Sequence, residues 1–214
     1  MYKYIFFDLD GTLTDPGEGI TNSVAYALDK FGIDVPPREE LYKFIGPPLK
    51  DSFAEYYGMS ADECNQALKY YREYYADRGI FENSVYGGIE ELLSEIKNRG
   101  RKIILATSKP DVFAGKILEH FGLVEYFDFV AGADMAETRV KKDEVIAYAL
   151  EKCDLRDKTD EILMVGDRKH DVLGAAAFGI DALGVTYGYG SERELIEAGA
   201  SYLASAPDEI LNFT

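Results

Sequence analysis

The sequence predicts an α/β protein, in which a Rossmann-like parallel sheet carries an inserted all-helical segment. Two observations support this prediction. Short, fully apolar runs recur along the chain, each followed by a helical pattern, and this alternation is typical of a parallel sheet covered on both faces. The first two runs are separated by about ninety residues, far more than one crossover helix needs, so the intervening segment is expected to fold separately.

Five strands are expected, because aliphatic, β-branched and aromatic residues dominate five short runs. They are Tyr4–Phe7, Lys102–Ala106, Phe127–Ala131, Ile162–Val165 and Asp181–Val185. The carboxyl ends of parallel strands lie at one edge of the sheet, and ligands bind just beyond that edge. The residues that follow these runs are therefore the candidates for chemistry.

The segment of residues 16–82 is expected to form several helices. Ser60, with Glu63 three residues later, has the pattern of a capping box at the start of a long helix. We therefore expect an α/β core of residues 1–15 and 83–214 and an inserted helical cap of residues 16–82.

Composition limits the classes of partner. The chain has 23 Lys and Arg against 39 Asp and Glu, a formal net charge of −16. This charge repels polyanions, so we expect neither a nucleic-acid polymer nor a membrane surface as a partner. Apolar runs of strand length and the lack of a signal-peptide pattern favour a cytoplasmic location. Cys64 and Cys153 are interpreted as free thiols, and the oligomeric state is left open between monomer and dimer.

The first strand ends in Asp8-Leu9-Asp10-Gly11-Thr12. Residues i and i+2 of a strand point to the same side, which would bring two carboxylates together. Their repulsion at ~4 Å is ~4 kcal/mol at an effective dielectric constant of about 20. Such a pair needs a cation or a proton to neutralise it, so the motif favours chemistry over a simple turn.

The second strand is followed by Thr107-Ser108-Lys109-Pro110, which leads into a helical pattern. Hydroxyl and backbone N–H groups at the start of a helix suit a phosphate oxyanion. Taken alone, however, the motif is equally typical of an ordinary helix cap with Pro in the first turn.

The third and fourth strands are followed by charged residues of opposite sign. Lys141 and Lys142 open a helix after the third strand, and taken alone they could be a solvated charge run. Asp167 and Asp171 follow the fourth strand, where Gly166 permits a close approach of the backbone. The combined set is an acid pair, hydroxyls, a lysine and a second acid pair, all at carboxyl ends of strands.

This set resembles the haloacid dehalogenase-like superfamily of hydrolases, over essentially the whole chain. The most specific matches are residues 6–13 and 165–171, and residues 175–190 resemble the phosphoglycolate phosphatase branch and the nearby 5′-nucleotidase-like group. The resemblance implies a sheet with the strand order 5-4-1-2-3, in which the nucleophile follows the central strand.

The resemblance also implies the roles of the acids and of the lysine. Asp8 would be the nucleophile that becomes an aspartyl phosphate, and Asp10 the general acid and then the general base. Mg²⁺ would be held by a carboxylate oxygen of Asp8, the backbone carbonyl of Asp10 and the carboxylate of Asp167. Asp171 would hold a metal-bound water or orient Lys142, and Lys142 would bridge Asp8 and the phosphate.

Substrate contacts follow from the same resemblance. Thr107 and the backbone N–H of Ser108 would hold phosphate oxygens, together with Gly11 and Thr12. In relatives, the cap loop that corresponds to Phe44–Lys50 reads the leaving group, so Lys50 could meet a carboxylate or a second phosphate. A Lys50 that faces solvent is equally compatible with the sequence.

Two departures from the family pattern leave a choice open. The family lysine is often followed by Pro, whereas Asp143 follows Lys142, so Lys141 competes for the role. The Val145-Ile146 pair that comes after favours Lys142. The second motif has Thr-Ser-Lys where relatives often have Thr-Asn-Lys, a mild change if the contact is a backbone N–H.

The charges of the expected site balance. Asp8, Asp167 and Asp171 carry three negative charges, which Mg²⁺ and Lys142 neutralise if Asp10 holds a proton. A carboxyl group beside other carboxylates has a raised pKa, so that proton is plausible. Hard oxygen ligands favour Mg²⁺ over Zn²⁺ as the cofactor.

We therefore expect a Mg²⁺-dependent phosphatase that hydrolyses a small phosphorylated metabolite, with phosphoglycolate or a nucleoside 5′-monophosphate as leading substrates. The presence of Asp10 argues against a dehalogenase, and Thr12 favours a phosphatase over a mutase. The alternatives are a sugar phosphomutase similar to β-phosphoglucomutase, and a phosphate-sensing protein without turnover.

Overall fold

The computed structural model describes residues 2–136 and 138–214 of the chain. The chain divides into two compact units. The first, which we call the sheet unit, consists of Met1–Thr14 and Val85–Thr214, and the second, the helical unit, consists of Asp15–Ser84. The two connections between them carry β2 (Thr14–Asp15) and β3 (Ser84–Val85), which pair as a short two-stranded sheet.

Among the described residues, the sheet unit contains a six-stranded sheet with the order β5-β4-β1-β6-β7-β8, in which every neighbouring pair is parallel. Read from the other edge, this order confirms the predicted arrangement around a central first strand. The sixth strand, β8, was not predicted, because three residues at the edge of a sheet leave little sequence signal. The strands are β1 (Tyr4–Phe7), β4 (Lys102–Pro110), β5 (Phe129–Ala133), β6 (Ile162–Gly166), β7 (Asp181–Val185) and β8 (Tyr202–Ala204).

The bounds of β4 differ from the prediction, which ended this strand at Ala106. β4 continues to Pro110, and its pairing with β5 shifts register between Ala106, opposite Ala131, and Pro110, opposite Ala133. The strand therefore carries extra residues at its carboxyl end. An apolar pattern cannot reveal this irregularity, because Thr107–Lys109 are polar.

The third predicted strand begins two residues too early. Val124–Tyr126 form a 3-10 turn, in which the backbone N–H of Phe127 donates to the carbonyl of Val124. The chain enters the extended conformation only after this turn, and β5 begins at Phe129. Phe127 follows the turn with extended backbone angles but lies outside β5, so the strand prediction was wrong at this residue.

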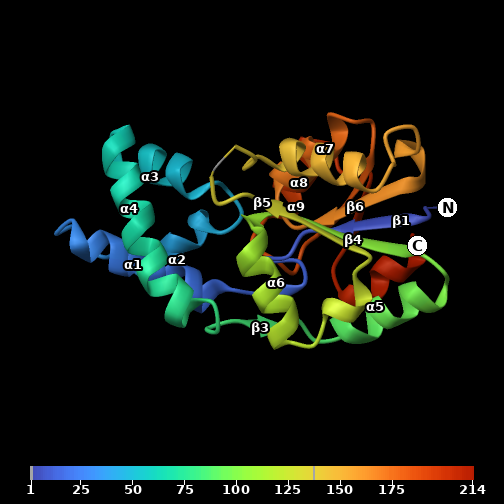
Figure 1. Ribbon diagram of the computed structural model, residues 1–214, viewed down its shortest axis with the longest axis horizontal. Helices are drawn as coiled ribbons and strands as arrows, with labels where there is room; N and C mark the ends of the chain where they lie inside the picture. The colour runs from blue at the N-terminus through green and yellow to red at the C-terminus, as the bar shows by residue number, and fades with distance from the viewer. Residues whose placement is uncertain (1, 137) are drawn as a thin grey trace. The chain divides into compact units, whose positions relative to one another are not determined.

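Helices cover both faces of the sheet. Figure 1 shows α7 and α8 on one face and α5 and α6 on the other. The face under α7 and α8 buries strand residues such as Phe6 and Met164 with helix residues such as Val145 and Val172. This burial of apolar surface is the main source of stability in such a layered domain. The helices of this unit are α5 (Ile89–Asn98), α6 (Asp111–His120), α7 (Lys142–Lys152), α8 (Lys169–Ala176) and α9 (Glu192–Ala198).

The helical unit confirms the expected run of helices between the first two strands of the large sheet. The predicted capping box is present, since Ser60 Oγ accepts from the backbone N–H of Glu63 and Glu63 Oε2 accepts from the backbone N–H of Ser60. The α-helix that it opens ends at Tyr74 and is followed directly by a π-helical turn, Tyr75–Gly79. The helices are α1 (Gly17–Lys30), α2 (Arg38–Leu41), α3 (Leu49–Tyr57) and α4 (Ala61–Tyr74), with a 3-10 turn at Tyr42–Phe44.

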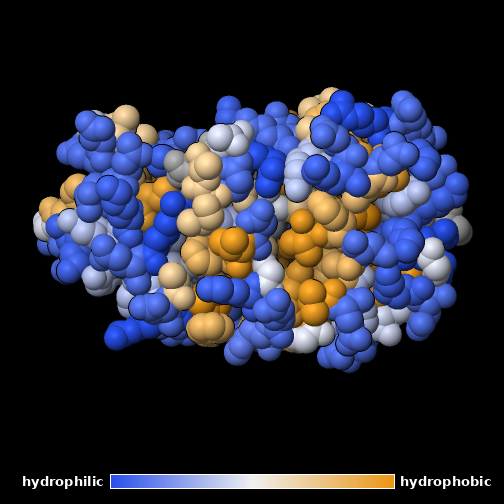
Figure 2. Space-filling view, in the orientation of Figure 1, coloured by the Kyte–Doolittle hydropathy of each residue, from blue (hydrophilic) through white to orange (hydrophobic). Residues whose placement is uncertain are grey.

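Figure 2 shows a mostly hydrophilic face, on which apolar side chains gather in the middle of the view beside α6. In the part of the chain that the structure describes, no helix is both long enough and apolar enough to span a lipid bilayer.

Candidate active site

Four side chains that follow three different strands meet at the carboxyl edge of the sheet. Asp8 follows β1 and Asp167 follows β6, whereas Asp171 lies on α8 and Lys142 begins α7. The Lys142 Nζ lies 2.8 Å from Asp8 Oδ1 and 2.7 Å from Asp171 Oδ1. All four residues are buried, so these ion pairs are shielded from water.

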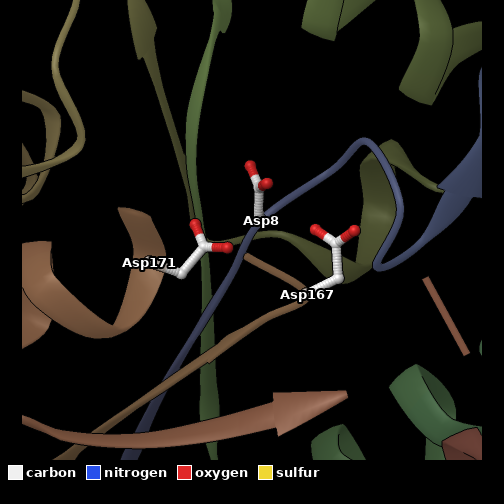
Figure 3. A group of neighbouring side chains, drawn as sticks. All are labelled: Asp8, Asp167 and Asp171. Carbon is white, nitrogen blue, oxygen red and sulfur yellow. The ribbon is translucent and has the colours of Figure 1, made fainter. Parts of the chain in front are cut away.

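The three carboxylates form one cluster. One oxygen from each of Asp8, Asp167 and Asp171 lies within 4.8 Å of the others, and Figure 3 shows the three side chains converging from separate segments. Carboxylate oxygens at this spacing can bind the same divalent cation.

Hydrogen bonds fix the orientation of two of these acids. The backbone N–H of Tyr189 donates to Asp167 Oδ2 at 2.7 Å, whereas Asp167 Oδ1 is buried and has no hydrogen-bond partner. The backbone N–H of Arg168 donates to Asp171 Oδ2 at 3.0 Å, which leaves Oδ1 to face Lys142. Each carboxylate is therefore held by one oxygen and presents the other to the cluster.

Two glycines make room for the acids. Gly11 has φ +81°, and a Cβ at this position would lie 2.1 Å from Asp167 Oδ2. A Cβ at Gly166 would lie 2.2 Å from the Asp171 Cγ. Only glycine tolerates both the positive φ and the contact at position 11. The close approach of Asp167 therefore explains why the motif has glycine at this position.

Lys142 and the neighbouring Lys141 lie in different environments. The Lys142 Nζ also donates to the backbone carbonyl of Ala106 at 2.8 Å, so three acceptors surround the ammonium group. Burial alone would lower the pKa of Lys142, but the carboxylates of Asp171 and Asp8 outweigh it and raise the pKa. Lys141 is exposed. The structure thus brings Lys142, and not Lys141, to the carboxylates.

The carboxylates outnumber the single cation. Burial raises the pKa of Asp167 well above its usual range, and the negative charges of Asp171 and Asp8 raise it further. Burial and Asp8 also raise the pKa of Asp171, against the lowering effect of Lys142, to about 6. Burial is the largest cause of both rises, and the negative charge of neighbouring carboxylates adds to it.

Asp10 has a partner that was not predicted. The Lys109 Nζ lies 2.7 Å from Asp10 Oδ2, and both residues are buried. Burial raises the pKa of Asp10, and the positive charge of Lys109 opposes this rise. The predicted charge balance omitted Lys109. With it, four carboxylates, two lysines and one Mg²⁺ sum to zero while Asp10 is ionised, and to one positive charge while Asp10 holds a proton, which its raised pKa favours.

The sequence contained one signal for Lys109. Thr107 and Lys109 are two residues apart at the end of a strand, so their side chains share a face. Lys109 is part of the second motif, but the motif alone predicts no function for it. The contact of the Tyr189 backbone with Asp167 had no such signal, because a backbone N–H is the same for every residue type except proline.

The remaining predicted residues lie as follows. Thr107 is buried, and its Oγ1 accepts from the backbone N–H of Lys109 at 3.2 Å. Ser108 is half-buried, and the buried Thr12 Oγ1 has no hydrogen-bond partner. Lys50 lies on α3 of the helical unit. Their contacts with a phosphate or a leaving group stay predictions.

Comparison with known proteins gives consistent matches. The model of the haloacid dehalogenase-like hydrolase family matches residues 5–185. A 5′-nucleotidase of Pseudomonas aeruginosa is 46% identical over 194 residues, which cover 91% of this chain and 87% of that protein. The crystal structure of a predicted phosphatase from Clostridium acetobutylicum superimposes with a TM-score of 0.97 at 48% identity and covers 100% of this chain and 98% of that one.

Two further relatives have different names. A phosphoglycolate phosphatase of Vibrio parahaemolyticus is 29% identical over 217 residues, which cover 98% of this chain and 94% of that protein. The tyrosine-protein kinase PtkA of Mycobacterium tuberculosis is 42% identical over 189 residues, or 88% of this chain. The match spans 63% of the kinase, so more than a third of that protein has no counterpart in this similarity.

Proposed function

The chain belongs to the haloacid dehalogenase-like hydrolase family, and from this membership we propose that it hydrolyses a small phosphate monoester through an aspartyl phosphate on Asp8, with Mg²⁺ bound beside it. It is a phosphoric monoester hydrolase, as the names of its relatives indicate. The observation that carries the proposal is the buried cluster in which Asp8 meets two further carboxylates and Lys142.

The donor set fits Mg²⁺. It offers three hard carboxylate oxygens in one buried place, and Asp167 Oδ1 has no hydrogen-bond partner there. Asp8 and Asp167 would hold the ion, together with the backbone carbonyl of Asp10, and Asp171 would take part through a water. When bound, Mg²⁺ supplies positive charge that lets a phosphate dianion approach an anionic nucleophile.

The residues of the chain would have the following roles in the reaction. Asp8 attacks phosphorus, and the proton on Asp10 passes to the oxygen of the leaving group. Lys142 neutralises Asp8 and the transferring phosphoryl group, while Thr107 and the backbone N–H of Ser108 hold its oxygens. Asp10 then removes a proton from water as the water attacks the aspartyl phosphate. General acid–base help of this kind contributes about 10²–10⁴-fold in rate.

The leading substrates are a nucleoside 5′-monophosphate and phosphoglycolate. The first is supported by the relative with 46% identity, which is named a 5′-nucleotidase, and the second by a more distant phosphoglycolate phosphatase. Both are small monoesters with a dianionic phosphate group, and phosphoglycolate carries a carboxylate as well. We propose that the helical unit is the cap that sets this choice, with Lys50 among its contacts.

A phosphate-release screen tests the proposal. The purified protein with Mg²⁺ should release inorganic phosphate from p-nitrophenyl phosphate and from at least one of the two leading substrates, and EDTA should abolish this release. No phosphate release from any of them would contradict the proposed function. Isomerisation of a hexose phosphate without net hydrolysis would favour a mutase instead.

Stabilisation by Mg²⁺ should depend on pH. Mg²⁺ must displace the protons that the raised pKa values of Asp167 and Asp171 retain, so binding should weaken as the pH falls through about 6. We expect Mg²⁺ to raise the thermal midpoint more at about pH 7.5 than at about pH 5, measured against EDTA. Asp167→Asn should remove the Mg²⁺-dependent rise, and the exposed Asp157→Asn should keep it. Equal rises at both pH values would contradict this prediction.

A further inference from the structure

The ion pair between Lys109 and Asp10 has no role in the steps described above. Its two side chains are only 5% and 11% exposed, and the Nζ–Oδ2 distance is 2.7 Å. A buried ion pair loses the hydration of both groups, so it is weak as a device for stability alone. Its place beside the nucleophile calls for a functional reason.

The contact divides the two oxygens of Asp10. Oδ2 is bonded to Lys109, whereas Oδ1 is buried and has no hydrogen-bond partner. A carboxyl group held at one oxygen can exchange a proton only at the other. Lys109 can keep its bond to Oδ2 whether or not Oδ1 carries a proton, because an ammonium group donates to a carboxylate oxygen and, more weakly, to the carbonyl oxygen of the acid.

The fold supplies Lys109 from the same strand end as the predicted phosphate-binding residues. Lys109 lies in the part of β4 where the pairing register with β5 shifts, and such irregularities re-aim side chains near active sites. The backbone N–H of Lys109 donates to Thr107 Oγ1, which ties the two residues together. One irregular strand end therefore holds both Thr107 and the partner of Asp10.

We propose that Lys109 is a positioning residue for the general acid, which holds Asp10 Oδ2 so that Oδ1 faces the oxygen of the leaving group. This inference rests on the proposed function. In the first step the bond from phosphorus to the leaving oxygen breaks, its electron pair stays on that oxygen, and the proton moves to it from Asp10 Oδ1. In the second step Oδ1 takes a proton from the attacking water while the bond between phosphorus and Asp8 breaks.

The test compares two substrates that differ in their need for an acid. The p-nitrophenolate ion leaves readily without a proton, whereas the alkoxide from benzyl phosphate does not, although both substrates carry one aromatic ring. The ratio kcat/KM reports the steps up to departure of the leaving group. Lys109→Met should lower kcat/KM for benzyl phosphate on the order of 10²-fold, and for p-nitrophenyl phosphate by less than about tenfold.

Three further variants separate positioning from other roles. Asp10→Asn should show the same preference for the activated substrate. In the Asp10→Asn background, Lys109→Met should add no further difference between the substrates, because its effect passes through Asp10. Lys116→Met makes the same substitution at an exposed lysine of α6 and should leave kcat/KM unchanged for both substrates.

The comparison remains informative if Lys109→Met folds poorly, because both substrates are measured on one preparation and the folded fraction cancels from their ratio. An equal fall in kcat/KM of Lys109→Met for both substrates, as expected if Lys109 contacted the phosphate directly, would overturn the inference. An unchanged kcat/KM for both substrates would overturn it as well. If Asp10→Asn lowers kcat/KM equally for the two substrates, Asp10 is not the general acid and the inference fails. The proposed hydrolysis itself fails only if the wild-type protein releases no phosphate from these substrates or from the two leading ones.

Discussion

Asp8→Asn is expected to lower the rate of phosphate release on the order of 10⁴–10⁶-fold, the range seen when a covalent nucleophile is removed. The asparagine amide oxygen carries no full negative charge, so it attacks phosphorus poorly. The remaining groups, Lys142 and Thr107 among them, would still bind the phosphate. We therefore expect the loss in kcat, measured by phosphate release under saturating substrate, with a smaller change in KM.

The same variant should keep its fold. Asp8 belongs to a buried group of three carboxylates with Lys142 as the cation, so removing one negative charge relieves repulsion. Without Mg²⁺, its thermal midpoint should equal or exceed that of the wild-type protein. Asp157→Asn, the same substitution at an exposed position, should change neither rate nor midpoint. Full activity of Asp8→Asn would eliminate the aspartyl phosphate from the mechanism.

The strand bounds show how far an apolar pattern can predict this fold. The observed limits of β1 and β7 are those predicted, because apolar residues dominate both strands and polar residues follow them. The pattern was less accurate for β4 and β5. There the limits depend on a register shift and on a 3-10 turn, and both are set by neighbouring backbone, not by the hydrophobicity of the segment itself.

For the candidate site, the sequence predicted most of the residues but not all of their contacts. Motif spacing indicated which acids and which lysines are candidates, but the choice between Lys141 and Lys142 needed the orientation of the start of α7. The contact from Tyr189 could not be read from the sequence, because it is made by a backbone group more than twenty residues after Asp167. Charge balance also needed the structure, since Lys109 is a counterion only through the path of β4.

Lys142→Met is expected to be the most destabilising of these substitutions, by about 3–5 kcal/mol in the free energy of unfolding without Mg²⁺. The variant leaves the carboxylates of Asp8 and Asp171 buried without their shared cation, and the carbonyl of Ala106 without its donor. Denaturant unfolding in EDTA measures the loss. Lys141→Met is the matched control at the neighbouring exposed position, and it should stay within about 0.5 kcal/mol of the wild-type protein.

Two conditions should reduce the cost of Lys142→Met if charge is its cause. Lower pH protonates the crowded carboxylates, so the difference from the wild-type protein should be smaller at about pH 5 than at about pH 8. Added Mg²⁺ would restore part of the missing positive charge and should recover part of the stability, although not the rate, because the ammonium group that neutralises Asp8 during attack is gone. A loss that is the same at both pH values would assign the effect to the packing of the lysine stem instead. Unfolding of Lys142→Met at the wild-type midpoint would show that the ion pairs of Lys142 contribute nothing to the folded state.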